Sequence, residues 1–280
     1  MIKLFAFDID GTLLDNKSKV PDSSIEALKK LDDAGIKVVL ASGRVFSSVK
    51  YNQNLLNIKG PIVATNGSLI SLDGRDIYKT YPLGEDKLKQ LYEFCISNRL
   101  DFHIYDDENY YTNRVNLEKI KHLEIDNNYG MNYQVDLIYK NDPISYLIEN
   151  NKKAVKFQIS GIDDNNLSRN EIVKVLNNDF SDSLYITSSG FSQLEIGNKN
   201  ATKWSSIEEI CKILGINKNE IAAIGDAHND IPMVSNAELG FAMGNAKEEL
   251  KEIADIIVAN NESSGVLEAV NYVLEVNKNV

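Results

Sequence analysis

Cysteine is scarce in this 280-residue sequence, and long apolar runs are missing. The two cysteines, Cys95 and Cys211, are too few and too far apart to predict a disulfide framework or a cysteine-based metal cluster. No apolar stretch approaches the roughly 20 residues that a membrane-spanning helix needs. Asp8 also interrupts the N-terminal apolar run too early for the core of a secretion signal. We therefore expect a cytoplasmic protein without a membrane partner.

Positive charge is also in deficit, because 30 Lys and Arg stand against 41 Asp and Glu, a formal net charge of −11. An acidic surface repels nucleic acid and anionic lipid, so we expect neither as a partner. It also repels phosphorylated metabolites. Any anion site must therefore carry its own local positive charge, from a metal, a lysine or helix N-termini.

Apolar strand patterns alternate with amphipathic helix patterns in residues 1–82 and again in residues 196–280. The strand patterns, such as "IKVVLAS" at 36–42, are continuously apolar, which is typical of parallel strands covered on both faces. The pattern at 22–35 predicts a helix, and the one at 67–81 predicts a hairpin. We predict an α/β fold whose doubly wound, mostly parallel, Rossmann-like core sheet comes from both end segments.

Residues 83–195 follow a different pattern, with clustered helices and strands that alternate between polar and apolar positions. This pattern predicts an α+β domain, inserted into the core, whose sheet has one open face. We call this segment the cap and the remaining residues the core. Four cap residues are candidates for the face that meets a substrate, although a plain core or surface role is an equal alternative. They are His103, Tyr105, Tyr110 and Tyr111.

Asp8 and Asp10 stand two positions apart at the end of the first apolar strand, followed by Gly11 and Thr12. Side chains at this spacing on an extended chain point the same way, roughly 6–7 Å apart. A phosphoryl group with its metal fits that gap, and ligands bind at the carboxyl ends of parallel strands. Solvated acids at a turn are the alternative, but the combined D-x-D-G-T set favours a functional site.

Several motifs in chain order resemble those of the haloacid dehalogenase-like hydrolases. "DIDGTLLD" is similar to the first motif of that family, "VLASGR" to the second, Lys203 to the lysine of the third and "GDAHNDIPM" to the fourth. Together with "TNG" and "AMGNA" they resemble the Cof-type subgroup, which carries a type IIB α/β cap. The resemblance implies a Mg²⁺-dependent phosphatase that acts on small phosphorylated metabolites, such as sugar or cofactor phosphates. We expect a monomer or a weak homodimer.

The resemblance also implies a role for each motif residue. Asp8 would be the nucleophile that forms an aspartyl-phosphate, and Asp10 would protonate the leaving oxygen and then take a proton from water. Asp8, the backbone carbonyl of Asp10 and Asp226 would hold Mg²⁺. Ser42 and Lys203 would bind the transferring group and neutralise its charge.

The remaining candidate residues would support the catalytic residues or bind the substrate. Asp230 would orient the metal's surroundings or Lys203. Candidates for substrate binding are Thr12, Gly43, Arg44, Asn66 and Asn229. Ser42 could also cap a helix, and we expect His228 to be an exposed loop residue.

One departure from the family pattern bears on the third motif, because Trp204 follows Lys203 where the subgroup usually has Gly. The large ring could tilt Lys203 or pack under the cap. Two rival functions remain: a phosphomutase on the same core, and a catalytically silent protein that binds a phosphorylated metabolite.

Overall fold

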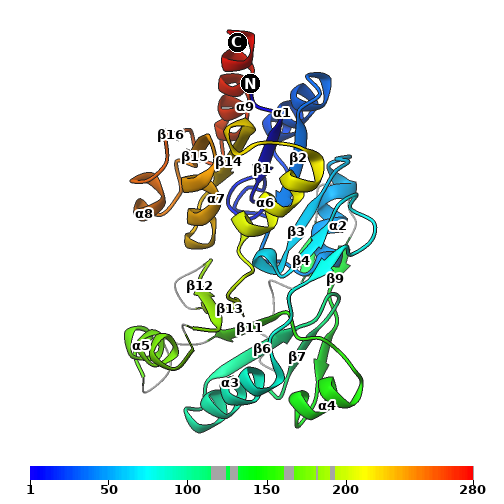
Figure 1. Ribbon diagram of the computed structural model, residues 1–280, viewed down its shortest axis with the longest axis vertical. Helices are drawn as coiled ribbons and strands as arrows, with labels where there is room; N and C mark the ends of the chain where they lie inside the picture. Colours follow the sequence, from blue (N-terminus) through cyan, green and yellow to red (C-terminus); the bar gives the residue numbers. More distant parts are fainter. Residues whose placement is uncertain (115–123, 127–131, 161–166, 181, 190–192, 280) are drawn as a thin grey trace.

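Two sheets divide the computed structural model, which describes residues 1–114, 124–126, 132–160, 167–180, 182–189 and 193–279 (Figure 1). An eight-stranded sheet draws its strands from residues 4–80 and 221–257, and a six-stranded sheet draws its strands from residues 101–198. Both chain termini lie at the end of the molecule farthest from the six-stranded sheet (Figure 1). Within the described residues, no helix is both long and apolar enough to cross a membrane.

The larger sheet runs in the order β16-β15-β14-β1-β2-β3-β4-β5, and its first six strands are parallel. Its strands are β1 Leu4–Phe7, β2 Lys37–Ala41, β3 Ile62–Ala64, β4 Leu69–Ser71, β5 Lys79–Thr80, β14 Ile221–Gly225, β15 Leu239–Ala242 and β16 Ile256–Ile257. Every residue of β1 is buried, which fits a central parallel strand covered on both faces. The predicted fold class, a mostly parallel α/β core, is confirmed.

Helices cover both faces of this sheet, and α1 packs against α9 while α6 packs against α7. They are α1 Asp22–Asp33, α2 Phe46–Leu55, α6 Lys203–Leu214, α7 Ile231–Asn236, α8 Glu248–Lys251 and α9 Gly265–Lys278. Two short 3₁₀ turns, η1 Thr65–Gly67 and η5 His228–Asp230, follow β3 and β14, and a third, η4 Lys218–Glu220, precedes β14. The turns η1 and η5 therefore lie at the strand ends where ligands bind in such sheets.

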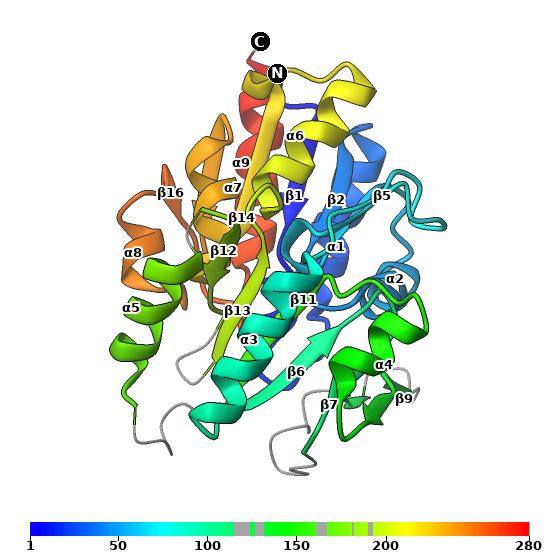
Figure 2. The same ribbon diagram turned by 60° about the horizontal axis from the view of Figure 1, so that its bottom comes forward.

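The smaller sheet is mixed, with the order β10-β7-β6-β11-β13-β12. Its strands are β6 Asp101–Tyr105, β7 Tyr110–Thr112, β10 Leu137–Tyr139, β11 Lys156–Ser160, β12 Leu184–Thr187 and β13 Gln193–Asn198, beside a separate pair, β8 Glu124–Asp126 and β9 Asn132–Gln134. Helices α3 Glu85–Ser97, α4 Pro143–Glu149 and α5 Arg169–Phe180 lie on the side of this sheet away from the core (Figure 2).

Strand periodicity gives the two faces of the smaller sheet opposite character. On β11, Phe157 and Ile159 belong to an apolar cluster with residues of α3, α4 and α5. Lys156 and Gln158 alternate with them and line a cavity on the other face. Side chains at successive positions of a strand point to opposite faces, so the cap presents a polar sheet face toward the core.

Candidate active site

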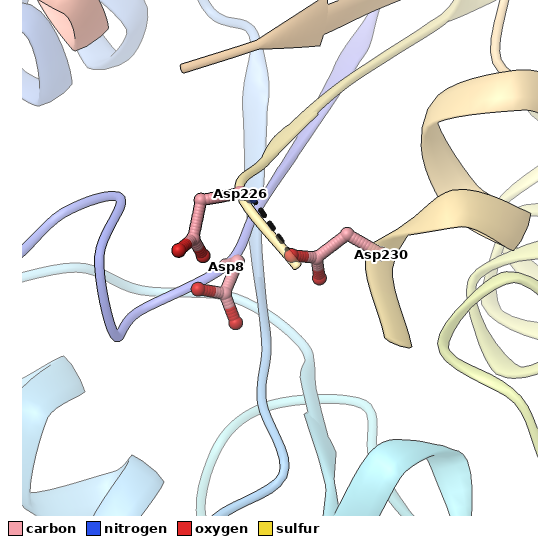
Figure 3. Close-up of side chains that lie close together, drawn as sticks. All are labelled: Asp8, Asp226 and Asp230. Carbon is pink, nitrogen blue, oxygen red and sulfur yellow. Dashed lines mark hydrogen bonds between the residues drawn. The ribbon is translucent and has the colours of Figure 1, made fainter. Parts of the chain in front are cut away.

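Two carboxylates stand at the ends of neighbouring parallel strands. Asp8 directly follows β1 and Asp226 directly follows β14, and these strands pair in parallel. Figure 3 shows the carboxylates of Asp8, Asp226 and Asp230 directed toward a common region. Gly11 makes room for them, because its φ of +77° and the 2.4 Å that would separate a Cβ from Asp226 Oδ2 exclude a side chain there.

Lys203 lies among these carboxylates and is fully buried. It opens helix α6, whose start is fixed by a reciprocal pair of bonds between Thr202 and Ser205. Its Nζ donates to Asp8 Oδ1 at 2.6 Å and to Asp230 Oδ1 at 2.5 Å. Trp204 does not displace it, because that ring packs into the core's apolar cluster with Lys218 Nζ 5.5 Å from its centroid.

Asp230 is held by donors on both of its oxygens. Oδ1 accepts from Lys203, and Oδ2 accepts from the backbone N–H groups of Asp226 and Ala227 at 2.9 and 3.0 Å. A carboxylate engaged in this way is better suited to orienting its neighbours than to binding a ligand directly. Among the described residues, no side chain or backbone group donates to the carboxylate of Asp226.

Asp10, unlike the buried acids, is exposed. Its side chain is 54% exposed and forms a two-bond pair with the guanidinium of Arg44, whose Nε lies 2.7 Å from Asp10 Oδ2. The fork of an arginine fixes the plane of a carboxylate as a lysine could not. Arg44 therefore sets where the Asp10 carboxylate lies relative to Asp8.

Ser42 lies at the end of β2 and is buried beside the same cavity. Its Oγ accepts from the backbone N–H of Arg44 at 3.2 Å, which leaves its own O–H for another acceptor. The next helix, α2, begins after Val45 and takes no hydrogen bond from a capping side chain. The helix-cap interpretation of Ser42 is therefore wrong.

The acidic cluster could hold a metal ion. One oxygen from each of Asp8, Asp226 and Asp230 lies within 4.8 Å of the others. Burial and repulsion between the carboxylates raise the pKa of Asp8 to about 8, although the positive charge of Lys203 lowers it, and raise the pKa of Asp226 to about 9. Crowded, buried carboxyl groups that ionise with difficulty on their own, and that offer oxygen ligands, fit a hard divalent cation that would stabilise their ionised forms.

These pKa shifts predict how the stability of the metal-free protein depends on pH. A raised pKa stabilises the fold while the group is protonated, and that contribution is lost as pH rises from about 4 to about 9. We expect the free energy of unfolding, measured with a chelator present, to fall over this range by at most about 1.4 kcal/mol per pH unit for each group. Mg²⁺ should flatten the slope.

Asp226→Asn is the matched variant for this measurement, because it removes one of the two titrating groups and keeps the side-chain size. We expect it to reduce the slope of unfolding free energy against pH. An unchanged slope in the metal-free variant would contradict the assignment.

A cavity of about 340 Å³ lies between the carboxyl ends of the core strands and the polar face of the cap sheet. Its core wall holds Asp8, Asp10, Ser42, Gly43, Arg44, Asp226 and Asn229. Its cap wall includes Tyr105, Tyr110, Lys156, Gln158, Gln193 and Glu195. The volume suits a small metabolite.

The remaining predicted residues lie around this cavity in different ways. Gly43 and Asn229 line it, whereas Asn66 lies behind them and accepts from Asn229 Nδ2 at 3.0 Å. Thr12 is fully buried and is not part of the cavity wall. Its place in substrate binding stays a prediction.

Of the four cap candidates, two line the cavity and two do not. Tyr105 and Tyr110 line the cavity. Tyr111 lies in the apolar cluster behind the sheet and donates to Asp106 Oδ2 at 2.6 Å, so of its two alternatives the plain core role applies. His103 is buried and does not belong to the cavity wall.

Two buried charged residues of the cap wall, Lys156 and Glu195, are missing from the sequence-based predictions. The available signal was the strand periodicity, since both occupy the polar positions of otherwise apolar strands. Their partners in the core lie more than 100 positions away in the sequence, at separations of 113 and 129 residues, so no local motif marks them.

Comparison with known proteins places this geometry in a family. A family model described as haloacid dehalogenase-like hydrolase matches residues 5–270. The putative phosphatase YxeH of Bacillus subtilis is 30% identical over 97% of this chain and 98% of its own length. The 5-amino-6-(5-phospho-D-ribitylamino)uracil phosphatase YcsE, also of Bacillus subtilis, is 27% identical over 97% of this chain and 95% of its own.

A solved haloacid dehalogenase-like hydrolase from B. subtilis shares the fold, with a TM-score of 0.84 at 24% identity over 97% of this chain and 99% of its own. The phosphatase relatives span nearly the whole chain and confirm the predicted enzyme class, a phosphoric monoester hydrolase. Because the family model also covers both acidic strand ends, Lys203 and the cap, the chain belongs to the family of haloacid dehalogenase-like hydrolases.

Proposed function

We propose that the protein is a Mg²⁺-dependent phosphatase that hydrolyses small phosphorylated metabolites through an aspartyl-phosphate on Asp8. The observation that carries the proposal is the contact of Asp8 with the buried Lys203, at 2.6 Å, beside a cavity that also contains Asp10 and Asp226. A buried carboxylate held by a lysine, beside a second carboxylate that is exposed to the cavity, suits a nucleophile with a separate proton donor.

The proposed reaction has two steps that share these residues. An oxygen of Asp8 forms a bond to phosphorus as the bond to the leaving oxygen breaks, and Asp10 gives that oxygen its proton. Water then attacks phosphorus, Asp10 takes the proton of the water, and the Asp8 carboxylate is released with inorganic phosphate. Lys203 and the hydroxyl of Ser42 neutralise charge on the transferring group.

Asp8 and Asp226, with the backbone carbonyl of Asp10, would hold the Mg²⁺ ion. When bound, the ion supplies positive charge that offsets the phosphoryl oxygens and the crowded carboxylates. Asp230 keeps Lys203 and the backbone after β14 in position for this arrangement.

The charges of the cavity wall favour a substrate with a single phosphate. Among the lining residues that the structure describes, Arg44 is paired with Asp10, and Lys156 with Glu195. Neither cation is left over for a second phosphate, whereas Gln158, Gln193 and Tyr110 are neutral polar residues of the cavity wall. We propose a monophosphate with a short polyhydroxylated chain. YcsE, named for a phosphoribitylamino compound, has a substrate of this kind.

A phosphate-release screen with Mg²⁺ tests the proposed function. We expect sugar and polyol monophosphates to be hydrolysed in preference to sugar bisphosphates and nucleoside triphosphates, because a second phosphate would meet no unpaired cation. Transfer of the phosphoryl group to a second sugar position, without free phosphate, would indicate a phosphomutase. Absence of any turnover across the panel would favour a binding protein and contradict the proposal.

We further propose that residues 1–82 and 196–280 form the catalytic domain and residues 83–195 the cap domain, within a cytoplasmic protein. The two sheets support this division, except that strand β13 of the cap sheet continues past residue 195 to Asn198.

A further inference from the structure

Two charged side chains of the cap, Lys156 and Glu195, are buried where the cap meets the core. They lie on neighbouring strands, with Lys156 Nζ 3.2 Å from Glu195 Oε1. Each also contacts a core loop: Lys156 Nζ donates to the backbone oxygen of Gly43 at 2.6 Å, and Glu195 Oε2 accepts from Asn66 Nδ2 at 2.7 Å. Buried charges are costly without such partners, so this pair depends on the contact with the core.

The side-chain amides of Asn66 and Asn229 connect Glu195 to the core wall of the cavity by hydrogen bonds. Asn229 Nδ2 donates to Asn66 Oδ1 at 3.0 Å, so Asn66 bridges Glu195 and Asn229. Asn229 lines the cavity. Its Oδ1 is buried and accepts no hydrogen bond from any residue within the described ranges.

The chemistry of the groups fixes which group donates and which accepts in each hydrogen bond of this series from Lys156 to Asn229. An ammonium group only donates and a carboxylate only accepts. Because Glu195 can only accept, Asn66 must turn its NH₂ toward the carboxylate and its carbonyl toward Asn229. Asn229 must then donate to Asn66, which leaves its Oδ1, without a donor among the described residues, as the atom that can accept from a bound group.

Gly43 allows these groups to come together. A Cβ at this position would stand 3.0 Å from Asn66 Oδ1 and 3.4 Å from both carboxylate oxygens of Glu195. Lys156 and Glu195 of the cap can therefore both approach the core at Gly43, because this residue has no side chain.

We infer that Glu195 is a positioning residue of the active site, which orders Asn66 and Asn229 so that Asn229 offers an acceptor oxygen to a hydroxyl donor bound in the cavity. The inference rests on the proposed function, because the donor is either a water molecule on Mg²⁺ or a hydroxyl of the bound phosphate. Glu195 lies on the cap and both amides lie on the core. The core wall of the site is therefore ordered only while the cap is in contact with it.

Glu195→Gln tests this inference, because it exchanges donor and acceptor in the hydrogen bonds from residue 195 to Asn66 and from Asn66 to Asn229. The size of the side chain at position 195 does not change. Lys156 still requires an acceptor, so the new amide turns its carbonyl to Lys156 and its NH₂ to Asn66. Both asparagine amides then flip, and Asn229 presents an NH₂ group to the donor. We expect the calorimetric affinity for Mg²⁺ alone, or for inorganic phosphate at saturating Mg²⁺, to fall about tenfold. The probe that loses affinity identifies the source of the donor.

The double variant N66D/E195Q restores the original direction. The carboxylate introduced at position 66 accepts from both neighbours, so Asn229 again offers its Oδ1. Aspartate tolerates the left-handed backbone of this position, φ +58°, as asparagine does. We expect this variant to recover most of the lost affinity. A purely structural contribution of the carboxylate at position 195 would give no such recovery.

E209Q is the matched control, because Glu209 also accepts from a lysine, Lys79 at 2.8 Å, but lies outside the cavity wall. We expect it to leave both affinities unchanged. The inference is overturned if E195Q changes neither affinity by more than about twofold, or if N66D/E195Q binds no better than E195Q. Wild-type protein that binds both probes but hydrolyses no phosphate ester would contradict the proposed function alone, since the affinity ratios would still be measurable.

Discussion

Asp8→Asn is expected to abolish phosphate release, with a loss on the order of 10⁴-fold or more, as for other enzymes that lose their catalytic nucleophile. The amide cannot form the bond to phosphorus that the proposed reaction needs. The fold should persist, because burial already favours a neutral side chain at this position and the amide oxygen can still accept from Lys203. Initial rates with 4-nitrophenyl phosphate and Mg²⁺ measure the effect.

A fold control is required for this variant, and the thermal unfolding temperature of the metal-free protein supplies it. We expect that temperature to be unchanged or higher, since one of the crowded carboxylates is removed. Turnover retained by a carefully purified Asp8→Asn protein would contradict the assignment of Asp8 as the nucleophile.

Lys203→Met is the second change with a large expected effect, and it should lower both stability and activity. Lys203 is fully buried between Asp8 and Asp230, so its removal leaves two buried carboxylates without their shared donor. We expect the free energy of unfolding near neutral pH to fall by about 3–5 kcal/mol. Phosphate release should fall about 10²–10³-fold, because the positive charge facing the transferring group is lost.

Lys79→Met gives the comparison for stability. Lys79 also pairs with a carboxylate, that of Glu209, but its side chain is 42% exposed. Exposed ion pairs contribute about 0–1 kcal/mol, so a small change is expected there. Similar losses of unfolding free energy in the two variants would contradict the buried, shared-donor role of Lys203.

The core fold could be predicted from sequence because each of its elements carries a local pattern. The helix predicted over 22–35 is observed as α1, Asp22–Asp33, and the hairpin predicted over 67–81 is observed as β4 and β5. Helix α4 carries no such pattern, because its seven residues are too few for a helical period to emerge. It is fixed instead by Asp142, which accepts from the backbone N–H groups of Ile144 and Ser145.

Some residues of the site could likewise be predicted from local sequence patterns, whereas others depend on contacts between distant parts of the sequence. Asp8 and Asp226 could be predicted because each follows a buried strand within a recognisable motif. The pairing of Asp10 with Arg44 could not, since the side-chain direction of an exposed carboxylate depends on which cation reaches it. The Lys156–Glu195 pair was missed because its meaning depends on the contact between cap and core.

The most direct test of the account is the identity of the phosphorylated residue during turnover. We would mix the enzyme with a hydrolysed monophosphate and Mg²⁺, quench in acid within the first turnover, and locate the added phosphoryl group by peptide mass spectrometry. We expect an acid-stable phosphoryl group on the peptide that contains Asp8, and none in Asp8→Asn. Turnover with the phosphoryl group on another residue would contradict it.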